Sequence, residues 1–107
     1  MPESLRLVTI VVQRKRGQKV LDAALAAGAS GATYFYAQGT GVRERLGFLG
    51  RFIEAEKQVI LVVANAERAC QVLDAARVAG ELDNPGSGFA YVQDVSDVAG
   101  FFPAATT

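Results

Sequence analysis

The segment VLDAALAAG at residues 20–28 returns almost unchanged as VLDAARVAG at residues 72–80. Both segments place aliphatic and small residues at the spacing of one helical face, and both end on a glycine, the residue that commonly follows a final helical turn. The residues before them match at the same shift of 52 positions, because VTIVV at 8–12 corresponds to ILVVA at 60–64. The sequence therefore indicates two copies of one strand–helix unit.

Other segments complete two β-α-β units. Short stretches rich in β-branched, apolar or aromatic residues predict four strands, at residues 5–13, 32–38, 56–64 and 89–93. Apolar residues at helical spacing predict two helices, at 19–27 and at about 66–79. Asn65 is the expected N-cap of the second helix, and Gly28 and Gly80 are the expected stops. Residues 40–55 have no clear period and predict a loop.

Two such units predict a ferredoxin-like α+β fold, in which a four-stranded antiparallel sheet carries two helices on one face. Tyr34 and Tyr91 are expected to occupy equivalent places in the second strand of each unit. The strands are apolar at nearly every position, whereas an antiparallel sheet with one face in water normally alternates. We therefore expect another copy of the chain to cover the helix-free face. The alternative is a monomer whose loop and tail fold over the sheet.

Composition narrows the class of protein. A chain of 107 residues suits a single domain, and an apolar content of 50% is enough for a hydrophobic core. The 11 basic and 11 acidic residues cancel, so the charge balance does not indicate a polyanion such as DNA as a partner. Because the sequence has no apolar run near the ~20 residues that span a bilayer and no signal-peptide layout, we expect a cytoplasmic protein.

The chain contains no histidine and one cysteine. Without histidine, Ser-His-Asp catalysis and zinc hydrolysis are excluded, and we expect no metal site. Cys70 lies within the second predicted helix, so we expect a small buried residue rather than a nucleophile. A single cysteine allows no internal disulfide and suits a reducing compartment.

Two glycine-rich segments are candidate ligand-binding regions, at residues 37–47 and 81–89. Glycines allow backbone amides to point at an anion, and Arg43 and Arg45 add positive charge to the first segment. Neither segment matches a P-loop or a dinucleotide-binding motif, so ordinary turns are the alternative interpretation.

The charged side chains do not suggest a catalytic pair. Asp22 and Asp74 occupy matching places in the two predicted helices and are expected to be solvated. Glu54 and Glu56 are expected either to form ion pairs with Arg43 or Arg51 or to be solvated. The basic residues 14–16 predict a solvated turn.

In their order, these segments resemble the PII signalling proteins and their PII-like relatives. GATYFYAQGTG leads into a loop, EKQVILVVA follows, and the glycine-rich turn AGELDNPGSGFAYV precedes the last strand. Since the resemblance covers about residues 5–98, residues 1–107 are expected to form one PII-like domain, with an effector loop at about 40–55 and a tail at about 99–107.

The resemblance implies a homotrimer with nucleotide-binding clefts between neighbouring subunits. It also implies an effector loop that contacts a regulated partner. Carried over by position, the implied nucleotide-binding residues are Thr33, Gly39, Thr40, Gly41, Val42, Arg43, Gly86, Ser87, Gly88 and Phe89.

Three positions depart from the family pattern. Phe89 stands where a lysine typically ends the phosphate turn, and the places of two tail arginines fall at about Gly100 and Phe102. Each lost charge-assisted contact is worth ~1.5–3 kcal/mol. We therefore expect ADP, AMP or another small anion as the ligand rather than tightly bound ATP, with Arg43 or Arg45 as compensating cations.

The predicted loop contains neither tyrosine nor serine, so the modification switches of standard PII proteins have no acceptor there. Its apolar side chains either form a partner-binding patch or pack back as core. The expected partner-binding residues are Arg45, Leu46, Phe48, Leu49, Arg51 and Phe52.

By this resemblance the chain is a regulator rather than an enzyme. The implied partner is a membrane transporter in nitrogen or inorganic-carbon metabolism. Two alternatives share the fold: a CutA-like trimer, and a small ferredoxin-like enzyme that relies on Tyr34, Tyr36, Tyr91 or a carboxylate.

Overall fold

The computed structural model describes residues 4–39 and 56–101, and the predicted loop at 40–55 lies outside them. In chain order the elements are β1 (Leu5–Gln13), the short 3-10 helix η1 (Arg14–Arg16), α1 (Gly17–Ala26), β2 (Thr33–Gln38), β3 (Glu56–Asn65), α3 (Ala66–Ala79) and β4 (Gly88–Val95). Each predicted strand and helix is present, with its ends within two residues of the expected bounds.

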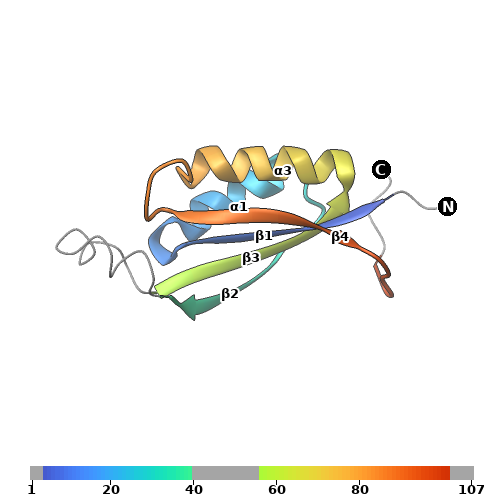
Figure 1. The fold of residues 1–107 in the computed structure, drawn as a ribbon, viewed down its shortest axis with the longest axis horizontal. Coiled ribbons are helices and arrows are strands. Elements are labelled where there is room, and N and C mark those ends of the chain that lie inside the picture. Colours follow the sequence, from blue (N-terminus) through green and yellow to red (C-terminus); the bar gives the residue numbers. More distant parts are fainter. Residues whose placement is uncertain (1–3, 40–55, 102–107) are drawn as a thin grey trace.

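The four strands form one sheet in the order β2-β3-β1-β4, and all neighbouring strands are antiparallel. Helices α1 and α3 lie side by side on one face of this sheet (Figure 1). The predicted ferredoxin-like α+β fold is therefore confirmed. Strand β1 is central, since it pairs with β3 on one side and with β4 on the other.

The hydrophobic core lies between the sheet and the two helices. Alternate residues of β1 and β3 point at the helices because side chains in a strand alternate between its two faces. The largest fully buried side chains are Val8, Ile10, Val12, Val20, Ile60, Val62 and Val72. Full burial of each such side chain contributes about 1.5–3 kcal/mol, so this single layer of contacts holds the helices on the sheet.

Helix α1 ends as predicted. Gly28 adopts a φ of +113°, in the left-handed region that favours glycine. The Gly28 amide donates to the Leu25 carbonyl at 3.1 Å, and the Ala29 amide donates to the Ala24 carbonyl at 3.2 Å. This pair of bonds is a Schellman motif.

Helix α3 ends at Ala79, directly before Gly80, as predicted, although its left-handed residue comes one position later than in α1. Gly80 remains right-handed, and Glu81 is the left-handed residue with a φ of +52°. The Leu82 amide closes the same kind of motif on the Arg77 carbonyl at 3.0 Å. A Cβ at Gly80 would lie 3.0 Å from the Ala76 carbonyl oxygen and 3.2 Å from the Val12 side chain, so the end of the helix packs closely on β1.

The start of α3 agrees with the sequence. The Asn65 side chain accepts a hydrogen bond from the Arg68 amide at 2.8 Å, which confirms the predicted N-cap. Cys70, however, is exposed rather than buried. The buried stripe of α3 begins at Ala69, and the next residue lies about 100° around the helix.

Tyr34 and Tyr91 lie on opposite faces of the sheet, so the prediction of equivalent places is wrong. Tyr34 pairs with Ile60, whose side chain is buried beneath the helices. Tyr91 pairs with Thr9, which points at the helix-free face. The internal repeat correctly aligns the first strands and the helices of the two units. In the second strands, the two tyrosines differ by one position, which places them on opposite faces.

The helix-free face of the sheet is apolar, and within the described parts of the chain no helix covers it. Its centre is formed by the half-buried side chains Leu7, Val11, Leu61 and Val63. Phe35, Phe89 and Tyr91 extend it as exposed aromatic residues toward both edge strands. We call this surface the open face. The interpretation that another copy of the chain covers it stays a prediction.

None of the helices that the structure describes combines the length and the apolar character that a membrane-crossing helix requires.

Candidate functional site

The glycine-rich turn between α3 and β4 is a compact structure held by its own backbone. The Asn84 amide donates to the Glu81 carbonyl at 3.0 Å, and the Ser87 amide donates to the Asn84 carbonyl at 3.2 Å. Gly88 has a φ of +140°, and a Cβ there would lie only 2.2 Å from the Val11 carbonyl oxygen. The chain can therefore enter β4 at this point only with a glycine.

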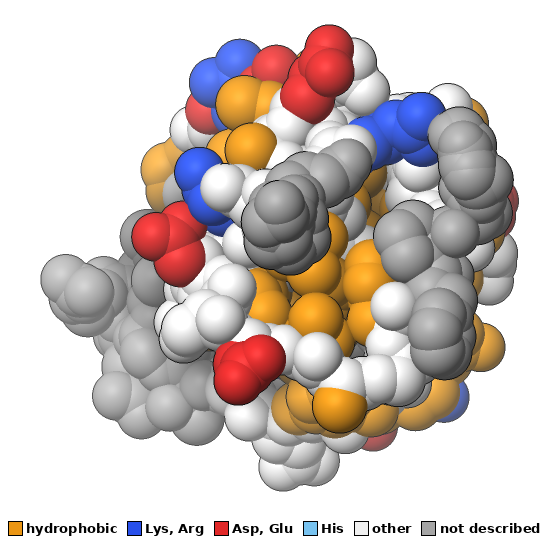
Figure 2. All heavy atoms as spheres, turned by 90° about the vertical axis from the view of Figure 1, so that its right-hand side faces the viewer, with side chains coloured by type: hydrophobic (Ala, Val, Ile, Leu, Met, Phe, Trp, Pro, Cys, Tyr) orange, Lys and Arg blue, Asp and Glu red, His pale blue; other side chains and the backbone are white. Residues whose placement is uncertain are grey.

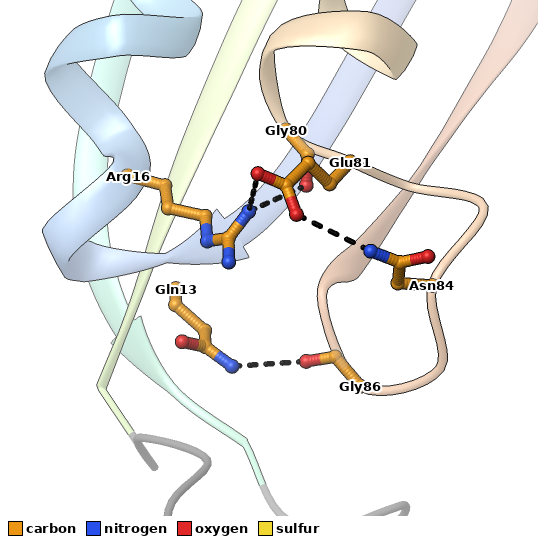
Figure 3. A network of polar contacts seen from close by, with 6 residues as sticks. All are labelled: Gln13, Arg16, Gly80, Glu81, Asn84 and Gly86. Carbon is orange, nitrogen blue, oxygen red and sulfur yellow. Dashed lines mark hydrogen bonds and ion pairs between the residues drawn. The ribbon is translucent and has the colours of Figure 1, made fainter.

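A polar network ties this turn to the end of β1 (Figure 3). The side-chain amide of Gln13 donates to the Gly86 carbonyl at 3.0 Å. Nη1 of Arg16 lies 3.2 Å from Oε2 of Glu81 and donates to the Gly80 carbonyl at 3.5 Å. Nδ2 of Asn84 donates to the other oxygen of Glu81 at 3.2 Å. The turn is thus positioned by two residues 64 to 73 positions away in the sequence.

The last residue of the turn presents an aromatic ring rather than a cation. Phe89 is 55% exposed and stacks on Tyr91, with ring centroids 6.2 Å apart and ring planes at 12°. A shallow hollow of about 260 Å³ beside the turn is lined by Leu73, Leu82, Gly88 and Phe89. Arg77 also lines this hollow, but it lies 3.9 Å from the Asp74 carboxylate.

Four side chains lie at the ends of β2 and β3 that precede and follow residues 40–55, a place that we call the neck. Gln38 and Glu56 form the last pair between β2 and β3. Nη1 of Arg14 lies 3.4 Å from Oε1 of Glu56, and its guanidinium carbon lies 4.3 Å from the centroid of the Tyr36 ring. Glu56 therefore has an ion pair, as one interpretation expected, but its partner comes from η1.

Gly39 follows the Gln38–Glu56 pair directly and is half-buried. A Cβ at Gly39 would make an ordinary contact with Lys57 at 3.5 Å, so close packing does not require a glycine at this position.

Thr33, the expected adenine-contacting residue, lies elsewhere. It is the first residue of β2 and pairs with Leu61 on the open face. It lines a hollow of about 490 Å³ with Leu7, Val63 and Phe101. Figure 2 views the molecule from this end and shows hydrophobic side chains at the base of a hollow.

The sheet brings the loop base and the glycine turn to the same end of the molecule. Gln13 pairs with Lys57 beside the neck, and Val12 pairs with Gly88 at the start of β4. Thr33 and Gly39 both lie on the β2 edge, three strand spacings or about 14 Å across the sheet from Gly88. Thr33 also lies six positions, or about 20 Å, along β2 from Gly39. One chain therefore places Gly39 and the Gly86–Gly88 turn on opposite edges of the same end of the sheet, and it holds Thr33 toward the other end.

The other expected site residues fall on parts of the chain that the structure does not describe. For the nucleotide they are Thr40, Gly41, Val42 and Arg43, and for the partner they are Arg45, Leu46, Phe48, Leu49, Arg51 and Phe52.

The two helices each carry one of the acidic side chains that the sequence places at matching positions. Asp22 and Asp74 are both exposed, as predicted, and Asp22 accepts a hydrogen bond from Gln18 at 2.9 Å. The described residues contain no group of three or more His, Cys, Asp or Glu side chains placed to hold a metal ion.

The sequence alone did not single out Gln13, Arg14 or Arg16 as site residues. Gln13 ends the central strand, and the two arginines come directly after it, so their position between the two glycine segments depends on the strand order. The available signal was that the basic residues 14–16 immediately follow a predicted strand.

Comparison with known proteins is consistent with this geometry. The family model of nitrogen regulatory protein P-II matches residues 5–101. Among solved structures, the crystal structure of Arabidopsis thaliana PII bound to citrate is similar, with a TM-score of 0.68 and 23% sequence identity over 90% of this chain and 81% of that chain. At this identity the structural likeness shows the fold alone. A search of curated proteins gave no match.

Proposed function

This chain belongs to the nitrogen regulatory protein P-II family of signalling and regulatory proteins, and we propose that it assembles as a homotrimer whose inter-subunit clefts bind a small anionic ligand. One observation carries the proposal: Gly39 at the loop base and the Gly86–Gly88 turn lie at the same end of one sheet. Glycine-bearing segments of this kind present backbone amides to anions.

The ligand class that we propose is an adenine nucleotide with few phosphates, ADP or AMP rather than ATP. The phosphate turn ends in the exposed aromatic ring of Phe89, where the family pattern has a lysine. The amide of Ser87 already donates to the Asn84 carbonyl, so it is engaged within the turn. A site with fewer cations favours a ligand with less negative charge.

The separation of Thr33 from the turn supports a cleft between two chains. Thr33 lies about 14 Å across the sheet from Gly88, as Gly39 does, but it also lies about 20 Å along β2 from Gly39. We propose that each cleft combines Gly39, residues 40–43 and residues 86–89 of one chain with Thr33 of a neighbour. The apolar open face gives neighbouring chains a surface on which to pack.

The proposed output is regulation of a partner protein through residues 40–55. Ligand binding at the neck changes the conformations available to the segment that extends from it. The side chains proposed to contact the partner are Arg45, Leu46, Phe48, Leu49, Arg51 and Phe52, and the proposed partner is a membrane transporter.

Isothermal titration calorimetry with ADP, AMP, ATP and bicarbonate tests the ligand. We expect ADP or AMP to bind more tightly than ATP, and a nucleotide at 100 times its Kd to raise the free energy of unfolding by ~2.7 kcal/mol. Absence of binding by all four compounds at millimolar concentration contradicts the proposal.

Two matched variants test whether Thr33 contacts the adenine group of the ligand. Thr33 and Ser30 both carry hydroxyl groups and line the same hollow. Thr33→Ala is expected to weaken adenine nucleotide binding about fivefold, the loss of one hydrogen bond, whereas Ser30→Ala is expected to leave it unchanged. Equal Kd values for the two variants would place the adenine elsewhere.

A further inference from the structure

We propose that Arg14 is the residue that holds a phosphate group of the ligand, in place of the cation that Phe89 does not supply. The proposal rests on the function proposed above, because it assumes a phosphate-bearing ligand between the loop base and the glycine turn. It assigns a binding role to η1, a segment for which the sequence predicted only a solvated turn.

Arg14 lies between the two glycine segments because it follows the central strand. On one side its neighbour Gln13 pairs with Lys57, next to the Gln38–Glu56 pair that precedes Gly39. On the other side the Gln13 amide group donates to the Gly86 carbonyl at 3.0 Å. A ligand that reaches from the loop base on β2 to the glycine turn before β4 must therefore cross the end of β1, where Arg14 begins η1. The contacts of Arg14 with Glu56 and Tyr36 place its guanidinium on the loop-base side of this path.

The present contacts of Arg14 leave it available to an anion. Its ion pair with Glu56 has an N–O distance of 3.4 Å, and the two side chains are 49% and 56% exposed. Such exposed pairs contribute about 0–1 kcal/mol. The Tyr36 ring, 4.3 Å from the guanidinium carbon, limits how far the side chain moves from the neck.

A phosphate is a stronger partner for this guanidinium than Glu56 is. Guanidinium groups bind phosphate oxygens through two parallel hydrogen bonds, which the long contact to Glu56 does not provide. Binding of the ligand then releases Glu56, the first described residue after the 40–55 segment. Arg14 thus links ligand binding to the residue that directly follows the 40–55 segment.

The four other described arginines have different assignments, and Arg68 donates to the Gly28 carbonyl. Arg16 contacts both the Glu81 carboxylate and the Gly80 carbonyl, so it positions the turn. Arg77 faces Asp74 on the exposed surface of α3. Arg6 pairs with Asp94 at 3.0 Å near the opposite end of β1. Arg6 therefore serves as the matched control, since it carries the same charge near the opposite end of the strand that Arg14 follows.

The experiment compares ADP and AMP binding by the wild-type chain, Arg14→Gln, Glu56→Gln and Arg6→Gln. Arg14→Gln is expected to raise the Kd for ADP about tenfold, the effect of losing one charge-assisted contact, and the Kd for AMP by less. Glu56→Gln is expected to lower the Kd for ADP about threefold because it removes a competing carboxylate. Arg6→Gln is expected to match the wild type.

The outcomes separate this inference from the proposed function. If the wild-type chain binds no nucleotide, the proposed function fails, and this inference fails with it. If the wild-type chain binds ADP but Arg14→Gln and Arg6→Gln show equal Kd values, Arg14 is not the phosphate ligand, and the proposed function stands. Should Arg14→Gln unfold at a lower temperature, Glu56→Gln decides: tighter ADP binding supports the inference, and an unchanged Kd overturns it.

Discussion

At Gly88 the main chain itself leaves no room for a side chain. Its φ of +140° disfavours any residue with a Cβ, and the position of that Cβ lies 2.2 Å from the Val11 carbonyl oxygen. Both obstacles arise from the main chain, so no side-chain rearrangement relieves them. The close approach of the turn to β1 depends on this single residue.

Gly88→Ala is therefore expected to lower the free energy of unfolding by about 3 kcal/mol or more, through backbone strain and the clash with Val11. Urea denaturation measures the change. Gly31→Ala is the control, because a Cβ at Gly31 would meet nothing within 4 Å, and it is expected to change stability by about 0.5 kcal/mol or less. Similar losses in both variants would contradict the steric explanation.

Single residues were predictable where local backbone chemistry determines them. Asn65 caps α3 and Gly28 ends α1 because each acts on amides or carbonyls within a few positions of itself. The surroundings of Gly80 were not predictable. Gly80 packs closely on Val12 of a distant strand, and Arg16 contacts the next residue, Glu81. Arg14 was missed as a site residue for the same reason: its neighbours in space come from β2 and β3.

At the scale of the element, α3 shows how narrow the buried stripe of a helix can be. Val72 is fully buried, whereas Val78, six residues later on the same helix, is 76% exposed. The buried residues of α3 have the spacing of one helical face, and they are Ala69, Val72, Ala76 and Ala79.

Val72→Ala is expected to lower the free energy of unfolding by about 2 kcal/mol, because it removes two buried methyl groups and leaves a cavity. Val78→Ala makes the identical chemical change at an exposed position of the same helix and is expected to alter stability by about 0.5 kcal/mol or less. Chemical denaturation of both variants provides the comparison. Equal losses would show that Val78 is covered in solution.

Strand registers were less predictable than the strands themselves. The repeat aligned β1 with β3 correctly, since Val8 and Ile60 both face the helices. It did not establish the register of β2 or β4, and a difference of one residue placed Tyr34 and Tyr91 on opposite faces. A strand has a period of two residues, so such a difference reverses every side chain.

The whole molecule presents one sheet face to its helices and leaves the other without cover among the described elements. Leu7, Leu61 and Val63 are the half-buried centre of this open face. An apolar surface of this kind on a small domain is typical of a surface that packs against another protein. It is the structural reason to expect an oligomer.

We expect the chain, of 11.3 kDa, to behave as a homotrimer of about three times that mass in light scattering coupled to size-exclusion chromatography. Leu61→Glu places a charge at the centre of the open face and is expected to yield monomers that lose nucleotide binding. Val78→Glu, on the exposed side of α3, is expected to leave the mass unchanged. A wild-type chain that remains monomeric at micromolar concentration contradicts the proposed inter-subunit clefts.

The sequence by itself determined the number, order and kind of the elements, because hydrophobic periodicity, capping residues and the internal repeat are local properties of the chain. It also identified the glycine segments at which a ligand is expected. Only the tertiary structure decided that Arg14 lies between those segments, that Thr33 lies apart from them, and which tyrosine faces the helices. These facts depend on strand order and register, which arise from contacts between residues far apart in the sequence.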